Sequence, residues 1–493
     1  MRIQQFAIEG LGHLSTMISD DDAGAAAIVD PRRDVDVYLD AARVADLRIT
    51  HVIETHLHND YVSGGRELAA LTGASHVIGA GAELRHEHRP VRNDDTFDVG
   101  SLRFRVLDTP GHTPEHVSYA VTDTSRADEP LLLMTGGSLL VGAVGRTDLL
   151  GEANAIPFAH AMYRSLHEVV LRHEDFVGVY PTHGAGSLCS TGIASTPFST
   201  IGFERRHNRL LRPMDLDAFA RALLSGQPAF PRYFARMRPT NRAGPALLGA
   251  VVPRPPPLTV DQVQGALDGG ALVIDARSPT AHALAHIPGS VSIPVGSSFG
   301  TWLGWVVDHD RPTVLVLDHP DDADDLARQA LRIGHETIVG LLHGGFETWV
   351  RSGLPLESTG RLTVDELAES MASEDPEPFV LDVRQASEYE RAHVPGSWHI
   401  GAGALPDRLE ELPRDRRIAV ICASGYRSSV AASLLRSAGF ETVDWVDEGV
   451  PAWQAARYAV ERGSGRDARS AATDDVAHSA RPGVEEPVGP HGH

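Results

Sequence analysis

Histidines and a carboxylate gather in three short segments of the N-terminal part of the chain. His56, His58 and Asp60 alternate in THLHND, His112 lies in DTPGHTPEH, and His183 lies in PTHG. Alternate spacing lets the side chains of one loop point at a common centre, and imidazole with carboxylate is a ligand set of zinc and of non-haem iron. These segments therefore predict a metal site.

The second chemical feature is Cys422, in VICASGYRSS. A short β-branched run, RRIAVI, precedes it and a helical pattern, VAASLLRSAGF, follows it, so we expect an exposed loop between a strand and a helix N-terminus. Backbone N–H groups and the helix dipole favour a thiolate and a bound sulfane sulfur there, and Arg427 adds a positive charge. The small residues that let this loop curl are Ala423, Ser424 and Gly425.

Cys189 is the other cysteine of the chain and lies six residues after His183, in a glycine-rich loop. This loop could approach the metal pocket, where Cys189 would carry or orient a persulfide. The alternative is a small buried hydrophobic residue, since cysteine is among the most buried residue types.

The elements around these residues are those of an α/β protein. The apolar run HVIET ends at the THLHND loop, and RELAALTG then has helical periodicity, so the ligands cluster where a strand ends. His183 likewise follows the β-rich run FVGVY.

Proline and internal repetition divide the chain. VVPRPPP, residues 251–257, is typical of a linker. After it, two segments resemble each other, and both place a histidine eleven residues after an aspartate, at Asp275 with His286 and at Asp382 with His393. We predict an N-terminal domain with its connecting segment (1–256), two repeated modules (257–358 and 359–462) and a disordered tail (463–493), where apolar residues are scarce.

The composition narrows the function classes. The net charge of −22 argues against nucleic acid as a partner. No apolar run is long enough to span a membrane, and two cysteines without a signal peptide favour the cytoplasm. The apolar segment FGTWLGWVV, with Trp302 and Trp305, is expected to pack in its own core, on a neighbouring domain or on a second copy in a homo-oligomer.

The motifs THLHND, TPGHT, TGGSLLVGAVGRTDL and PTHG resemble those of the metallo-β-lactamase superfamily. HGAGSLC, STIGFERRHN and PAFPRYFARMRPTNRAGP are similar to the persulfide dioxygenases that are fused to rhodanese modules. The resemblance implies an αββα sandwich with one Fe(II) held by His56 and His112. It also implies oxidation of glutathione persulfide, or of a similar small persulfide, to sulfite with O₂.

Two positions depart from this family pattern. Gly137 stands where the family has an aspartate ligand, and Tyr61 stands where two-metal members have a histidine. Both changes favour one metal ion at most, with His58 or Asp60 completing the set and Tyr61 and His183 lining the pocket. Zinc in place of iron, or a degenerate site without catalytic metal, are the alternatives.

The Cys422 loop, which runs on to Tyr426 and Arg427, resembles the active loop of rhodanese sulfurtransferases, and Asp382 and Glu388 match supporting motifs of that fold. The resemblance implies two α/β modules with parallel sheets. In the first copy Asp318 replaces the cysteine, and a carboxylate cannot carry sulfane sulfur.

Three functions remain open from the sequence. The first is a bifunctional enzyme in which Cys422 takes sulfur from thiosulfate or a persulfide and the metal domain oxidises the persulfide formed. The second is a sulfurtransferase with a non-catalytic metallo-β-lactamase domain, which Gly137 makes credible. The third is a zinc hydrolase acting on a thioester.

Overall fold

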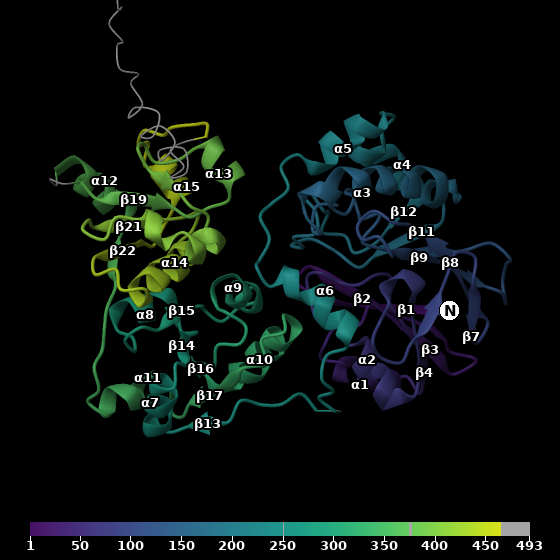
Figure 1. Ribbon diagram of the computed structural model, residues 1–493, viewed down its shortest axis with the longest axis horizontal. Coiled ribbons are helices and arrows are strands. Elements are labelled where there is room, and N and C mark those ends of the chain that lie inside the picture. Colours follow the sequence, from purple (N-terminus) through teal and green to yellow (C-terminus); the bar gives the residue numbers. More distant parts are fainter. Residues whose placement is uncertain (250, 374–376, 465–493) are drawn as a thin grey trace, which may run out of the picture. The chain divides into compact units, whose positions relative to one another are not determined.

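The computed structural model describes residues 1–249, 251–373 and 377–464 (Figure 1). They form two compact units: Met1–Ser278 with Ile293–Pro355, and Pro279–Ser292 with the described residues from Leu356 onward. Most of the predicted disordered tail, from residue 465, lies outside the described residues. In the part of the chain that is described, no helix is both long and apolar enough to cross a membrane.

Two mixed sheets form the N-terminal part of the first unit. The first sheet has the order β1-β2-β3-β4-β5-β6 and the second has the order β12-β11-β10-β9-β8-β7. The strands of the first sheet are β1 (Arg2–Ile8), β2 (His13–Asp20), β3 (Ala25–Val29), β4 (Arg48–Ile53), β5 (Ser75–Gly79) and β6 (Arg89–Val91). Those of the second are β7 (Thr96–Val99), β8 (Leu102–Asp108), β9 (Val117–Asp123), β10 (Leu132–Gly136), β11 (Gly178–Pro181) and β12 (Ser199–Thr200).

Helices cover the outer face of each sheet. These helices are α1 (Asp36–Val44), α2 (Gly65–Thr72), α3 (Glu152–Arg164), α4 (Ile201–His207) and α5 (Leu216–Leu224). Figure 1 shows α1 and α2 beside the first sheet and α3, α4 and α5 beside the second. The connecting segment that follows α5 contains α6 (Phe234–Ala243).

Strand alternation explains why each sheet is apolar on both faces. Ile18 of β2 packs between the sheets with Tyr119, whereas its neighbour Met17 packs outward with Tyr38 of α1. In the second sheet Ala120 packs outward with Phe219 of α5. Because successive side chains point to opposite faces, two buried faces require continuous apolar strands, and helices must cover the outer ones. The predicted αββα sandwich is confirmed.

The two repeats form parallel sheets. In the first unit the order is β13-β17-β16-β14, and the second unit contains the order β18-β22-β21-β19-β20. The strands are β13 (Pro257–Leu258), β14 (Leu272–Asp275), β15 (Val291–Ser292), β16 (Thr313–Val316), β17 (Ile338–Leu342), β18 (Gly360–Leu362), β19 (Phe379–Asp382), β20 (Trp398–His399), β21 (Ile418–Ile421) and β22 (Val443–Val446). The helices are α7 (Val260–Asp268), α8 (Pro279–Leu284), α9 (Phe299–Val306), α10 (Ala323–Arg332), α11 (Gly345–Arg351), α12 (Val364–Ser373), α13 (Ala386–Arg391), α14 (Tyr426–Ser437) and α15 (Val450–Ala455).

Within the first unit, α9 packs against the connecting segment. A Cβ at Gly304 would lie 2.3 Å from Cδ1 of Tyr233, so the tyrosine ring can lie on α9 only because this residue is glycine. The Thr301 hydroxyl donates a hydrogen bond to the Gly10 carbonyl at 2.8 Å, and Trp305 is buried. Of the expectations for the apolar segment FGTWLGWVV, the structure shows packing on a neighbouring domain.

Candidate metal centre and sulfur-transfer loop

The loop after β4 carries His56, His58 and Asp60, and all three are buried. Asp30, at the end of β3, holds this loop: its carboxylate accepts hydrogen bonds from the Thr55 N–H at 2.7 Å and the Thr55 hydroxyl at 2.8 Å. The Thr182 hydroxyl, next to His183, donates to the same carboxylate. One buried carboxylate therefore joins two of the loops that the sequence predicts to supply ligands.

His56 and His112 each have one ring nitrogen engaged and one available. Nδ1 of His56 is 2.8 Å from the Thr55 hydroxyl, and Nδ1 of His112 is 2.8 Å from the Arg146 carbonyl. Their Nε2 atoms are buried and have no hydrogen-bond partner among the described residues. Burial lowers the pKa of His112 to about 3 and that of His56 well below its usual range, so both rings are neutral, as metal ligands must be.

His58 is held between two carboxylates. Its Nε2 lies 3.3 Å from Asp30 and 3.3 Å from Glu54. Burial alone would lower its pKa, but the charge of Asp30 and then that of Glu54 raise the pKa of His58 to about 10. Nδ1 is buried and has no hydrogen-bond partner in the described ranges. Without a metal ion this ring is charged at pH 7, and it could bind a metal through Nδ1 only if the ion displaced the proton there, with the carboxylates behind it as outer partners.

Asp60, His183 and Cys189 lie close together beside these rings. Asp60 Oδ2 lies 3.2 Å from Nδ1 of His183, and Cys189 is 1 % exposed. Burial raises the pKa of the Cys189 thiol, and the Asp60 carboxylate raises it further. The sequence predicts Cys189 either near the metal pocket or buried, and in the structure both descriptions apply.

Gly137 leaves no room for the missing aspartate. A Cβ at this position would lie 2.3 Å from Cδ2 of His112, so the histidine ring occupies the space where a side chain would begin. The Gly137 N–H donates to Nε2 of His116 at 3.0 Å. Tyr61 is fully buried, and its ring stacks on His58 with a centroid distance of 4.4 Å.

The donors that remain form two overlapping groups of the kind that can hold a metal ion. Ligand atoms of His56, His58 and His183 lie within 4.8 Å of one another, and so do those of His112, His183 and Cys189. His183, which the sequence places among the possible ligands and in the pocket, belongs to both groups. Nitrogen donors with one thiol suit iron or zinc.

The sequence interpretation did not single out Asp30, Glu54 or His116. His116 does lie in the quoted segment TPGHTPEH, but it acts structurally, with Nδ1 at 2.8 Å from the Thr109 hydroxyl. Asp30 and Glu54 carry no motif of their own. Their role depends on contacts across the first sheet.

In the second unit, Cys422 follows β21 and precedes α14, as predicted, but it is not exposed. The cysteine is 1 % exposed, which corrects the expectation of an exposed thiol, because the glycine-bearing turn before α15 covers its backbone: a Cβ at Gly449 would lie 2.7 Å from the Cys422 carbonyl oxygen. The Gly425 N–H donates to Sγ at 3.2 Å, and the Ser428 hydroxyl lies 3.4 Å from Sγ. Gly425 needs its positive φ of 88° to aim this N–H.

Arg427 forms two hydrogen bonds to Glu388, at 2.6 and 2.7 Å. Burial lowers the pKa of Arg427, but Glu388 outweighs it and raises that pKa above its usual value. The arginine thus remains charged and fixed beside the loop. Of the other loop residues, Ser424 is exposed, and Ala423 and Tyr426 are half-buried.

The first repeat keeps the scaffold of this site without its nucleophile. Arg277 donates to Asp275 at 2.6 Å, as Arg384 donates to Asp382 at 2.6 Å in the second repeat. Val316 pairs with Asp275 as Ile421 pairs with Asp382, so the position of Cys422 is taken by the buried Leu317. This corrects the prediction that Asp318 replaces the cysteine: Asp318 is exposed and lies one residue further along.

Comparisons with known proteins agree with this architecture. A family model described as "Metallo-beta-lactamase superfamily" matches residues 8–172, and one described as "Rhodanese-like domain" matches residues 259–352 and 363–456. The hydroxyacylglutathione hydrolase of Methylococcus capsulatus is 32% identical over 232 residues, which are 44% of this chain and 88% of the relative. That of Dictyostelium discoideum is 28% identical over 170 residues, covering 34% of this chain and 61% of the relative.

Among solved structures, the metallo-beta-lactamase from Staphylococcus aureus subsp. aureus COL matches with a TM-score of 0.62 and 31% identity. The match covers 69% of this chain and 98% of that one. Such coverage includes more than the N-terminal sandwich alone, because the sandwich with its connecting segment makes up only about half of the sequence. The chain therefore belongs to the metallo-β-lactamase superfamily and carries two rhodanese-like domains after its metal-binding fold.

Proposed function

We propose that the chain oxidises a low-molecular-weight persulfide to sulfite at a single Fe(II) and transfers sulfane sulfur through Cys422. The observation that carries this proposal is the donor set: buried neutral imidazoles remain, whereas Gly137 and Tyr61 remove ligands that a two-metal hydrolase needs. The overall reaction balances as RSSH + O₂ + H₂O → RSH + SO₃²⁻ + 2 H⁺. The outer sulfur is oxidised by four electrons, and O₂ is reduced by four.

His56 and His112 would hold the iron through Nε2, with His58 or His183 as the third ligand. Bound Fe(II) supplies the coordination of O₂ and of the persulfide sulfur at one centre. Asp60 and His183, 3.2 Å apart, would accept the proton that the persulfide loses. Burial of all these groups excludes competing water.

At Cys422 the proposed donor is thiosulfate or a persulfide. The thiolate attacks the outer sulfur of thiosulfate, the S–S bond breaks, and sulfite leaves with the bonding pair. A small thiolate such as that of glutathione then attacks the outer sulfur of the Cys422 persulfide and regenerates the cysteine thiolate. The Gly425 N–H and the Ser428 hydroxyl would stabilise the anionic sulfur.

An oxygen electrode combined with metal analysis tests the proposal. Protein loaded with Fe(II) should consume one O₂ and form one sulfite per glutathione persulfide, and Cys422→Ser should retain this activity. With thiosulfate and cyanide, Cys422→Ser should lose at least about 100-fold of thiocyanate formation, whereas Cys189→Ser should retain it. A fully iron-loaded protein without O₂ uptake would overturn the oxidation, and an active Cys422→Ser would overturn the transfer.

A second candidate, zinc-dependent hydrolysis of a glutathione thioester, is favoured by the names of the relatives. The same purified protein loaded with Zn²⁺ should then cleave a hydroxyacylglutathione and take up no O₂. The loss of side-chain ligands at positions 61 and 137 disfavours this candidate.

A further inference from the structure

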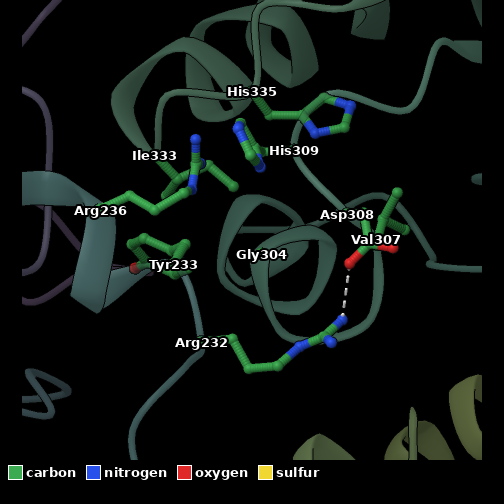
Figure 2. A pocket seen from close by; sticks show the side chains of 9 residues that line it. All are labelled: Arg232, Tyr233, Arg236, Gly304, Val307, Asp308, His309, Ile333 and His335. Carbon is green, nitrogen blue, oxygen red and sulfur yellow. Dashed lines mark hydrogen bonds and ion pairs between the residues drawn. The ribbon is translucent and has the colours of Figure 1, made fainter. Parts of the chain in front are cut away.

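A cavity of about 170 Å³ opens in the first unit between the connecting segment and the first rhodanese-like module. Figure 2 shows its charged and aromatic walls. Arg232, Tyr233 and Arg236 come from the connecting segment, and the module supplies the rest: Gly304, Val307, Asp308, His309, Ile333 and His335. The module without a cysteine thus forms much of the wall.

The walls of this cavity are held by close packing. Tyr233 lies on Gly304, where a Cβ would be 2.3 Å from its ring. Gly334, beside Ile333, lies close to Val62 and Met237, since a Cβ there would be 3.2 and 3.3 Å from their methyl groups. The shape of the cavity is therefore fixed by the close packing of the connecting segment on the module.

Two arginines face the cavity, and each has a carboxylate near it: Asp308 near Arg232 and Asp310 near Arg236. Arg232 forms an ion pair with Asp308 at 3.2 Å, the dashed line in Figure 2. Nη2 of Arg236 is buried and has no hydrogen-bond partner among the residues that the structure describes. A buried guanidinium N–H without an acceptor is costly, so a ligand oxygen would be stabilised at this point.

Two histidines complete the polar wall. His335 is buried, with Nε2 at 3.2 Å from the Thr313 hydroxyl, and His309 is exposed at the rim. Burial, and then the charge of Arg236, lower the pKa of His335 to about 4. The His335 ring is therefore neutral at pH 7, and the positive charge beside it is that of Arg236.

Tyr233, in the wall of the cavity, also lies near residues of the candidate metal centre. The tyrosine is buried, and after burial itself the charges of Asp60 and Cys189 are what raise its pKa. One side chain therefore lines the cavity and lies within electrostatic reach of two residues of the candidate metal site.

We propose that this cavity binds a small oxyanion, with Arg236 as its main partner. Two sources share this chemistry: a carboxylate of the thiol co-substrate, and the sulfur oxyanion that the proposed reaction releases. The anion site itself does not depend on the proposed function, which only supplies these two candidates.

Isothermal titration of the full-length, metal-free Cys422→Ser protein tests the proposal without using activity. The probes are sodium sulfite, glutathione and glutathione diethyl ester. We expect Arg236→Gln to weaken binding of the preferred probe at least about tenfold and Arg236→Lys to retain more of it. Arg221→Gln, at an exposed position of α5, is the matched control and should bind like the parent.

The probes separate the two sources. Binding of glutathione but not of its diester assigns the site to a carboxylate, and binding of sulfite alone assigns it to the sulfur oxyanion. A parent protein that binds neither sulfite nor glutathione would overturn the proposal. So would an Arg236→Gln variant that melts like the parent and binds with unchanged affinity. Failure of O₂ uptake would leave these results untouched.

Discussion

At the scale of single residues, Gly137 and His112 are coupled by space. The ring of His112 lies where the first atom of any side chain at position 137 would be. Its orientation is fixed from behind by the Arg146 carbonyl, so the ring cannot turn away without losing that hydrogen bond. An aspartate at position 137 therefore fits only if His112, a candidate metal ligand, moves.

Restoring the family residue should accordingly harm the protein. We expect Gly137→Asp to destabilise it by about 1–3 kcal/mol through overpacking and to lower its metal content. Urea denaturation and metal analysis measure both effects. Gly265→Asp is a control, because a Cβ there meets nothing within 4 Å. A Gly137→Asp protein with parent stability and tighter metal binding would contradict the packing argument.

The buried histidines predict a pH dependence for the metal-free protein. His112 and His13 have pKa values of about 3 in the folded state, against an ordinary value of 6.5. Between these values the unfolded chain binds protons that the folded chain does not, so stability falls as the pH drops below 6.5. Each histidine contributes a slope of about 1.4 kcal/mol per pH unit.

His58 acts with the opposite sign. Its folded pKa of about 10 means that its stabilising charge is fully present below pH 6.5 and is lost as the pH rises towards 10. Calorimetry from pH 5 to pH 9 should show the acid slope reduced in His112→Gln and the alkaline slope reduced in His58→Gln. Unchanged slopes in both variants would show that these rings titrate normally.

Residue types and motifs predicted His56, His112 and Cys422, because those residues sit in short local patterns. The partners of His58 could not be predicted in this way, since Asp30 reaches the metal loop from 25 residues earlier in the chain, across the sheet. The exposure of Cys422 was predicted wrongly for the same reason. The turn at Gly449 that covers it is remote in sequence.

At the scale of elements, the metal loop rests on the end of α10. The Val62 N–H donates to the Arg332 carbonyl at 2.7 Å. The Arg332 side chain donates to the fully buried Asp34 at 2.8 and 2.7 Å. A helix of the first rhodanese-like module thereby supports the loop that carries His56, His58 and Asp60.

Removing this buried charge should loosen the loop. We expect Asp34→Asn to destabilise the protein by about 3–5 kcal/mol and to weaken metal binding about 10- to 100-fold. Asp36→Asn is the matched control: Asp36 pairs with Arg328 at 2.6 Å but is 28% exposed, so its loss should cost about 1 kcal/mol or less. Thermal melts and a metal titration separate the two variants. Equal effects in both would argue against a special role for Asp34.

The sheets and their flanking helices followed from apolar runs and glycine-rich turns, since these patterns are local. The packing of α9 on Tyr233 could not be predicted from such local patterns. The tryptophan-bearing segment fits a core, a domain contact or a subunit contact equally well, and only the folded chain places Gly304 opposite the tyrosine ring. The domain limits remain predictions of the sequence.

At the scale of the whole molecule, the two proposed activities lie in different compact units: the metal centre in the first and Cys422 in the second. Because Cys422 is only 1 % exposed, a small thiol can reach its sulfur more readily than a protein side chain can. We therefore expect the sulfane sulfur to travel between the sites on a diffusing carrier such as glutathione.

Mixing two inactive variants checks this expectation. Cys422→Ser and His112→Ala proteins, each unable to consume O₂ with thiosulfate and glutathione, should together recover the parent rate within about twofold, since a free persulfide can pass from one chain to another. A mixture that stays inactive, while each variant keeps its own remaining half-reaction, would point to transfer within one chain.

The support that α10 gives to the metal loop has a consequence for the history of the chain. A duplicated module that has lost its nucleophile is ordinarily free to decay or to be deleted. Here Arg332 and Arg328 pair with Asp34 and the Arg332 carbonyl accepts from Val62, so deletion would remove two of the ion pairs of Asp34 and leave that with Arg32. The module without a cysteine therefore cannot be removed without changing the support of the metal loop.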